Sequence, residues 1–113
     1  MSYPRLFTIP GMGDLAESID TLRHEWAQSG DKPFPAPGGD GTGSPTAKAQ
    51  AGYHMDFVSK KIQEGKHSWR DLMRMRMNNL FATKKQDELK DHLLGLMALC
   101  AEWYADLEGR NDD

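Results

Sequence analysis

The stretch that decides the fold is WRDLMRMRMNNLFATKKQDELKDHLLGLMALCAEWYADLEG, residues 69–109. Its second half carries apolar side chains at alternating spacings of four and three residues, the periodicity of a helix with a buried face. These residues are Leu89, Leu93, Leu96, Cys100, Trp103 and Leu107. A second apolar stripe runs beside the first, from Leu94 to Ala105. A helix that is apolar on two sides must be covered on both, so we expect it to be central in a bundle or at a subunit interface.

The first half of the same stretch has a recognisable helix start. Ser68 and Asp71 match a capping box, in which the hydroxyl accepts from the N–H of residue 71 and the carboxylate accepts from the N–H of residue 68. A polar turn follows at residues 83–86, and Asp87 and Glu88 then place negative charge where the dipole of the next helix favours it. Because the connection is short, we predict an antiparallel helical hairpin.

An amphipathic helix is predicted near the N-terminus, over residues 13–29. It follows an irregular lead, residues 1–12, and the pair Asp14 and Glu17 predicts a capping box at its start. Its apolar residues form one narrow stripe, which implies a single buried face.

A second helix is predicted over residues 46–64, after a linker. Residues 30–45 are rich in proline and glycine, so they are incompatible with a helix or a central strand. Ser44 resembles an N-cap, with a proline following it at the first helical position. Gly65 is the expected C-terminal stop.

Together these patterns predict an all-α protein, a four-helix bundle without strands. The expected helices cover residues 13–29, 46–64, 69–83 and 87–108. We interpret residues 1–113 as a single domain, with a three-helix core over 46–109 and a short tail over 110–113. A chain of this size buries a modest core, so we expect the bundle to be completed by homo-oligomerisation into a dimer or tetramer.

Composition places the chain among globular proteins. It has 113 residues, of which 38% are hydrophobic, and a single cysteine, which excludes an internal disulfide. No apolar run reaches the ~18 residues of a membrane span, and residues 1–5 lack the pattern of a signal peptide. We therefore expect a cytoplasmic protein that does not associate with membranes.

The net charge of −3 conceals a basic region. Between residues 59 and 90 there are nine basic residues against four acidic ones. Six of these bases form a candidate surface for phosphate or nucleic acid: Lys60, Lys61, Lys66, Arg70, Arg74 and Arg76. No interleaved aromatic residues or base-reading motif accompany them, so a solvated helix face is the stronger interpretation.

Candidate catalytic residues are few. Cys100 lies within an apolar stripe and has no basic neighbour on its helix that would favour the thiolate, so we predict no catalytic residue there. Glu88 and Asp91 stand three residues apart and are weak candidates for a metal site. A borderline metal would need Asp91 and a set of histidines drawn from several segments: His92 with His24, His54 or His67. Solvated acids in a first helical turn are the better interpretation, and no cofactor is expected.

The run GKHSWRDLMRMRMNNLFATKKQDELKDHLLGLMALCAEWYADLEGR, residues 65–110, resembles the MazG-like nucleotide pyrophosphohydrolases. The resemblance rests on a tryptophan-initiated helix, a charged turn at 83–87 and a helix that ends in tryptophan. Its positions are Trp69, Leu72, Leu80, Leu89, Leu93, Ala98 and Trp103. It implies an all-α fold, a dimer or tetramer, and Mg²⁺-dependent cleavage of nucleoside triphosphates by an EExxE cluster on one helix and an ExxD cluster on the next.

This chain departs from the family at the acids. The first cluster falls on residues 75–79, MRMNN, and the second on residues 92–95, HLLG. The degenerate metal-site positions are therefore Arg76, Asn79, His92 and Gly95. An ExxD pattern is present only if the register shifts to Glu88 and Asp91. Losing three carboxylates and gaining an arginine disfavours metal-assisted hydrolysis.

We therefore expect a non-catalytic MazG-like protein that acts by binding, most simply to a protein partner, as in a phage or mobile-element protein that obstructs a host system. Two alternatives stay open. One is a Mg²⁺-dependent pyrophosphohydrolase that uses Glu88 and Asp91 with acids of the first helix: Asp14, Glu17, Asp20 and Glu25. The other is a binder of nucleic acid or of a nucleotide phosphate through the basic residues 60–76.

Overall fold

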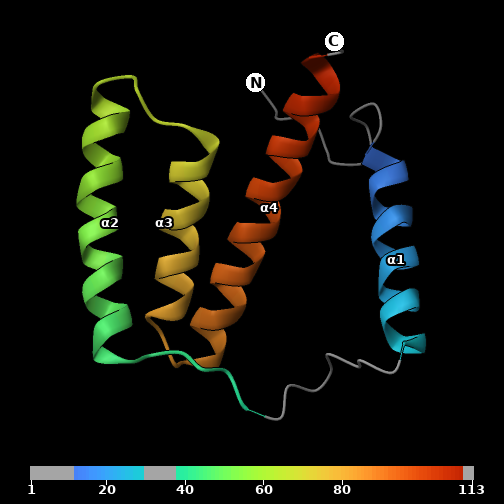
Figure 1. The fold of residues 1–113 in the computed structure, drawn as a ribbon, viewed down its shortest axis with the longest axis horizontal. Helices are drawn as coiled ribbons and strands as arrows, with labels where there is room; N and C mark the ends of the chain where they lie inside the picture. The colour runs from blue at the N-terminus through green and yellow to red at the C-terminus, as the bar shows by residue number, and fades with distance from the viewer. Residues whose placement is uncertain (1–11, 30–37, 111–113) are drawn as a thin grey trace. The chain divides into compact units, whose positions relative to one another are not determined.

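The computed structural model describes residues 12–29 and 38–110, and every regular element in these ranges is an α-helix (Figure 1). The helices are α1 (Met12–Gln28), α2 (Pro45–Gln63), α3 (Trp69–Phe81) and α4 (Gln86–Arg110). The all-α prediction is confirmed, and no predicted helix end lies more than two residues from the observed one. Residues 1–11 of the predicted lead, 30–37 of the linker and 111–113 of the tail fall outside the described residues, whereas Met12, predicted to belong to the lead, is the first residue of α1.

The chain divides into two compact units. One comprises residues 38–103, with α2, α3 and most of α4, and the other comprises residues 1–37 and 104–113. The single domain over residues 1–113 stays a prediction. None of the helices in the described ranges combines the length and apolar character that a bilayer span requires.

Helix α2 is closed at both ends by the residues that the sequence indicates. Ser44 caps its start by accepting from the Ala47 N–H at 3.1 Å, and Pro45 is the first helical residue. At its end Gly65 adopts a φ of 69°. The Gly65 N–H donates to the Ile62 carbonyl at 3.0 Å, and the Lys66 N–H donates to the Lys61 carbonyl at 2.9 Å. This pair of bonds is a Schellman motif, which turns the chain back toward α3.

Helix α3 starts with the predicted capping box. The Asp71 N–H donates to Ser68 Oγ at 3.2 Å, and the Ser68 N–H donates to Asp71 Oδ2 at 3.0 Å. Lys61, in the last turn of α2, forms an ion pair with the same carboxylate oxygen at 3.3 Å. Burial of the carboxyl acts to raise the pKa of Asp71, but the hydrogen bonds from Ser68 and the charge of Lys61 outweigh it and hold the pKa below its ordinary value.

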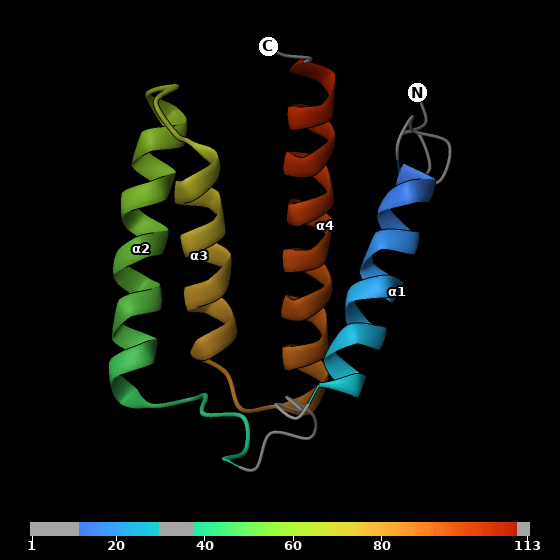
Figure 2. The same ribbon diagram turned by 45° about the vertical axis from the view of Figure 1, so that its right-hand side comes forward.

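Helices α2 and α3 lie side by side and antiparallel (Figures 1 and 2). The buried apolar residues of α2 are Ala51 and Val58, two turns apart on one face, and Val58 is 1% exposed. The end of α2 and the start of α3 are thus held by a Schellman motif, a capping box and an ion pair. We call this closed end the α2–α3 junction.

Helix α4 runs back along α3 after a turn at residues 82–85. Trp69, at the start of α3, stacks on Trp103, near the far end of α4, with ring centroids 6.0 Å apart and planes inclined by 4°. The start of α3 therefore lies beside the C-terminal part of α4, and the predicted antiparallel arrangement of these two helices is observed. Both tryptophans are half-buried.

The described part of the linker lies against the end of α3. The Gly43 N–H donates to the Phe81 carbonyl at 2.7 Å, which satisfies one of the carbonyls that a helix end leaves free. Gly43 is buried, has a φ of 85°, and contacts the side chain of Lys84 so closely that a Cβ atom would overlap it. Glycine is required here both by the backbone conformation and by the close approach.

Helix α1 is amphipathic, as predicted, but one detail of the prediction is wrong. The helix already begins at Met12, so Asp14 lies inside the first turn rather than before it. Asp14 therefore does not cap the helix as the first member of a box with Glu17; its carboxylate contributes through the helix dipole instead. The apolar stripe residues Ile19, Leu22 and Trp26 are each about half exposed.

Candidate functional site

The four degenerate positions of the resemblance lie on facing sides of α3 and α4, which we call the α3–α4 seam. Arg76 and Asn79 stand one turn apart on α3, and His92 and Gly95 stand one turn apart on α4. Nη1 of Arg76 lies 2.7 Å from the point where a Cβ on Gly95 would stand. Asn79 and His92 line the same pocket. The structure therefore brings all four positions together, with the guanidinium of the exposed Arg76 lying against Gly95.

The guanidinium of Arg76 fits at this position because Gly95 has no side chain. A glycine in the middle of a helix costs about 1 kcal/mol relative to alanine, so a compensating contact is expected where one occurs. Here the absent side chain leaves the space that the end of the Arg76 side chain fills. Arg76 forms no ion pair with any described residue, so its charge is not neutralised within the described part of the chain.

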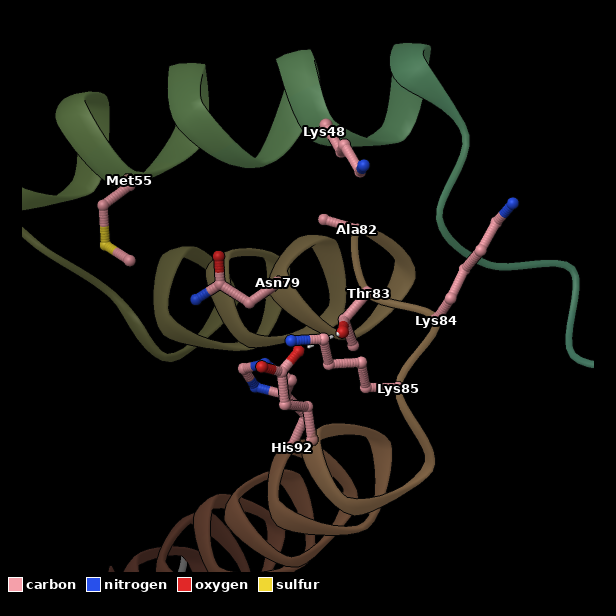
Figure 3. Close-up of a pocket in the computed structure, with 9 residues that line it drawn as sticks. Lys48, Met55, Asn79, Ala82, Thr83, Lys84, Lys85 and His92 are labelled. Carbon is pink, nitrogen blue, oxygen red and sulfur yellow. Dashed lines mark hydrogen bonds between the residues drawn. The ribbon is translucent and has the colours of Figure 1, made fainter.

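An open pocket of about 540 Å³ lies beside the seam, where α3 turns into α4 (Figure 3). Three elements and the turn contribute to its lining: Lys48, Met55, Asn79, Ala82, Thr83, Lys84, Lys85, Glu88 and His92. We call it the turn pocket. In Figure 3 the Lys48 side chain extends from α2 toward the end of α3, whereas the Lys84 side chain extends away from Lys85.

The charge of the turn pocket is unbalanced. Lys48, Lys84 and Lys85 line it with a single acid, Glu88. None of the three lysines forms an ion pair with a described residue. The Glu88 carboxylate accepts from the Thr83 hydroxyl at 2.6 Å, so part of its hydrogen-bonding capacity is already used. The pocket therefore has a net positive lining.

The weak metal candidates are not joined by further ligands. Glu88 lines the turn pocket, but Asp91 is exposed and does not line it. Over residues 12–29 and 38–110 no group of three or more histidine, cysteine, aspartate or glutamate side chains is arranged to hold a metal ion.

The six bases of the candidate phosphate or nucleic-acid surface do not share one face. Lys61 is engaged with Asp71, and its ammonium also lies 4.9 Å from the centre of the Phe57 ring. Arg76 points into the seam, about 120° around the helix axis from Arg70. The remaining members are exposed on α2, on the α2–α3 turn and on the outer side of α3: Lys60, Lys66, Arg70 and Arg74.

Helix α4 has two different apolar sides. Leu96, Leu99 and Trp103 are half-buried, whereas Leu94 and Met97 are 64% and 61% exposed. Other members of the exposed side are Leu93, Cys100, Tyr104 and Leu107. Met97 follows Gly95 by two residues, which places it on the side opposite the seam. Within the unit of residues 38–103, α2 and α3 do not cover this second side.

Sequence reasoning missed most of the turn pocket. Lys84 and Lys85 belong to the basic region, but nothing in the sequence distinguishes them from the other bases. Lys48 lies in the second turn of α2 and reaches the pocket only because α2 packs beside α3.

Comparison with protein-family models, with curated proteins and with solved structures finds no match for this chain.

Proposed function

We propose that this chain is a non-catalytic, MazG-like helical protein that acts by binding a protein partner. The observation that carries the proposal is the composition of the seam. Of the five positions where the family resemblance calls for carboxylates, four face one another across α3 and α4, and these carry arginine, asparagine, histidine and glycine; the fifth is Met75. The scaffold is consistent with the resemblance, while the charge of the seam is reversed.

The chemical reason is the requirement of Mg²⁺ for oxygen ligands. Metal-assisted cleavage of a triphosphate needs carboxylates that neutralise the ions and fix their positions. Arg76 instead brings a positive charge to the seam and is not neutralised by any described acid. A divalent cation would be repelled there, so we place the function of the seam in packing and in binding rather than in hydrolysis.

Support for a protein partner comes from the exposed apolar side of α4. Contiguous exposed apolar residues on a small protein are typical of interaction surfaces. The apolar residues buried in the described part of the chain are Met12, Ala51 and Val58, which is a small core for residues 12–29 and 38–110. We propose that α4 also covers part of this surface by homo-oligomerisation, into a dimer or a tetramer.

Two measurements test the proposal. Purified protein incubated with each nucleoside triphosphate and Mg²⁺ or Mn²⁺ should release no pyrophosphate above the no-protein control. Metal-dependent turnover would instead support the hydrolase alternative with Glu88 and Asp91 as ligands. Its controls are Glu88→Gln and Asp91→Asn, which should abolish any turnover that depends on these two carboxylates.

The mass of the protein in solution should exceed that of one chain in sedimentation equilibrium. Leu94→Asp and Met97→Asp should reduce this mass, because they place a charge on the exposed apolar side of α4. Gln50→Asp adds the same charge to an exposed position of α2 and should leave the mass unchanged. A monomeric wild-type protein at concentrations of about 100 μM would contradict the oligomer, since it would place the Kd of self-association above about 100 μM, weaker than about −5.5 kcal/mol.

A further inference from the structure

We propose that the turn pocket binds the phosphate group of a small phosphorylated ligand, directly through lysine side chains and without a metal ion. This site is separate from the exposed side of α4 on which the proposed protein binding rests. None of the basic residues in the region 60–76 lines the pocket. The charge of the pocket, the fixed backbone that carries its lysines and its size support the proposal.

The lysines give the pocket a net positive lining. They come from two segments that lie far apart in the sequence, Lys48 on α2 and the pair Lys84 and Lys85 in the turn, and the Lys84 side chain extends away from Lys85 (Figure 3). The described residues supply one carboxylate, Glu88, whose Oε2 already accepts from Thr83. Like charges in one concave site repel each other, and a concave site focuses their potential onto a bound counter-ion. A dianionic phosphate relieves this repulsion.

The backbone that carries these lysines is held in place by hydrogen bonds and packing. The Lys48 N–H donates to the Ser44 carbonyl at 3.0 Å, so Lys48 lies on the capped, ordered start of α2. Gly43 packs against the side chain of Lys84 and is itself bonded to the end of α3 at 2.7 Å. The stem of Lys84 is therefore packed against Gly43 at the rim of the pocket, and the turn that carries Lys85 is attached to the start of α2 through this contact.

The pocket is large enough for an organic group and has both apolar and polar walls. A volume of about 540 Å³ accommodates a small organic molecule and exceeds what a bare phosphate fills. Met55 and Ala82 contribute apolar wall, and Asn79 and His92 contribute groups that can hydrogen-bond. Lysine binds phosphate as a point charge, so it tolerates various orientations of the group. The combination fits a phosphate monoester with a compact organic part.

A nucleic acid fits the described surface less well than a small ligand. Binding along a polynucleotide needs a basic stripe that follows successive phosphates. Lys61 is paired with Asp71, and the Arg76 side chain lies against Gly95 in the seam. The basic residues outside the pocket therefore do not extend the positive charge of the pocket into a stripe. The pocket itself is a local concavity at one end of the helices. The ligand that matches it is therefore short.

The experiment is a titration of the full chain with glycerol phosphate in EDTA and low salt, followed by ¹H–¹⁵N chemical shifts. Glycerol is the matched uncharged control, and inorganic phosphate tests the anion alone. We expect shift changes confined to residues 79–92 and to the first turns of α2 with both phosphates, and none with glycerol. Changes centred on Lys60 and Arg70, or binding that EDTA abolishes, would overturn the proposal.

Variants then assign the binding to the lysines. Lys48→Gln and Lys85→Gln should each weaken binding about tenfold, the loss expected for a charge-assisted contact. Lys60→Gln removes the same charge at an exposed position outside the pocket and should change the affinity less than twofold. Thermal melts establish that each variant is folded. Equal weakening by all three variants would mean a general charge effect and would overturn the assignment.

A separate arm replaces glycerol phosphate by a single-stranded oligonucleotide. Tighter binding of the oligonucleotide that Lys48→Gln and Lys85→Gln leave unchanged would transfer the function to a nucleic-acid surface. The outcome is independent of the proposed protein-binding function, because pyrophosphate release and solution mass decide that proposal. Either can fail while the other stands.

Discussion

The two ends of helix α3 are built differently. At the α2–α3 junction the polar groups are paired within the junction itself. The bonds are the Schellman motif at Gly65, the capping box of Ser68 and Asp71, and the ion pair between Lys61 and Asp71. At the opposite end, three lysines line the pocket beside the turn into α4, and none of them forms an ion pair with a described residue. Locally paired groups stabilise a junction, whereas a concave cluster of unpaired cations can attract an anion. The first end therefore serves stability and the second is the candidate for function.

The largest effect is expected from the contact that holds α4 along α3. Trp103→Ala removes the ring that stacks on Trp69, and we expect it to lower the free energy of unfolding by about 3 kcal/mol. Urea denaturation followed by far-UV circular dichroism measures the change. Trp26→Ala, at a half-exposed position of α1, is the control and should cost clearly less. Equal losses would mean that the stacked pair is not a major part of the packing.

Alanine substitutions at two glycines should change the stability of the protein in opposite directions. Gly43→Ala forces a side chain onto a φ of 85° and against Lys84, and should destabilise by about 1–2 kcal/mol. Gly52→Ala, inside α2 with open space around it, should stabilise by about 0.5–1 kcal/mol. Melting temperatures of the two variants measure both changes. An unchanged melting temperature for Gly43→Ala would contradict the anchoring of this segment to the end of α3.

The capping box should contribute less, and its contribution should depend on pH. Ser68→Ala should cost about 1 kcal/mol near neutral pH, the usual value of an N-cap serine. Because the folded pKa of Asp71 is below its ordinary value of 3.8, its charged form is stabilised by folding. This contribution is complete at pH values above about 3.8 and is lost as the pH falls through the lower, folded pKa.

The matching measurement compares wild type with Asp71→Asn by urea denaturation at neutral pH and in acid. We expect the wild type to be more stable at pH 7 and the difference to disappear at a pH below the folded pKa. A difference that persists unchanged in strong acid would mean that the carboxylate charge does not matter at this junction.

The smallest effect is expected at the seam, where a double-mutant cycle isolates one contact. Gly95→Ala gains helix propensity but displaces the Arg76 guanidinium, so its net effect should lie within about 0.5 kcal/mol of zero. In an Arg76→Ala background the same substitution should stabilise by nearly 1 kcal/mol. The difference between the two is the coupling energy of the pair. No coupling would mean that Arg76 does not occupy the space above Gly95.

The correct predictions from sequence concern interactions between residues close in the chain. The helix limits, the Ser44 cap, the Ser68–Asp71 box and the stop at Gly65 all follow from patterns within about six residues, so backbone geometry fixes them. The error at Asp14 is of the same local kind. An acid three residues before another matches a capping box, but it also suits the first turn of a helix that begins earlier.

The sequence by itself thus determined four helices, their ends and the antiparallel return of α4 along α3, because spacing and capping act over a single turn. It also placed the four degenerate positions in pairs one turn apart. Only the tertiary structure decided that Arg76 rests over Gly95, that Lys61 pairs with Asp71, and that Lys48 meets the lysines of the turn. These contacts depend on how the helices are rotated and spaced against each other, and that packing is set by side chains distant in the sequence.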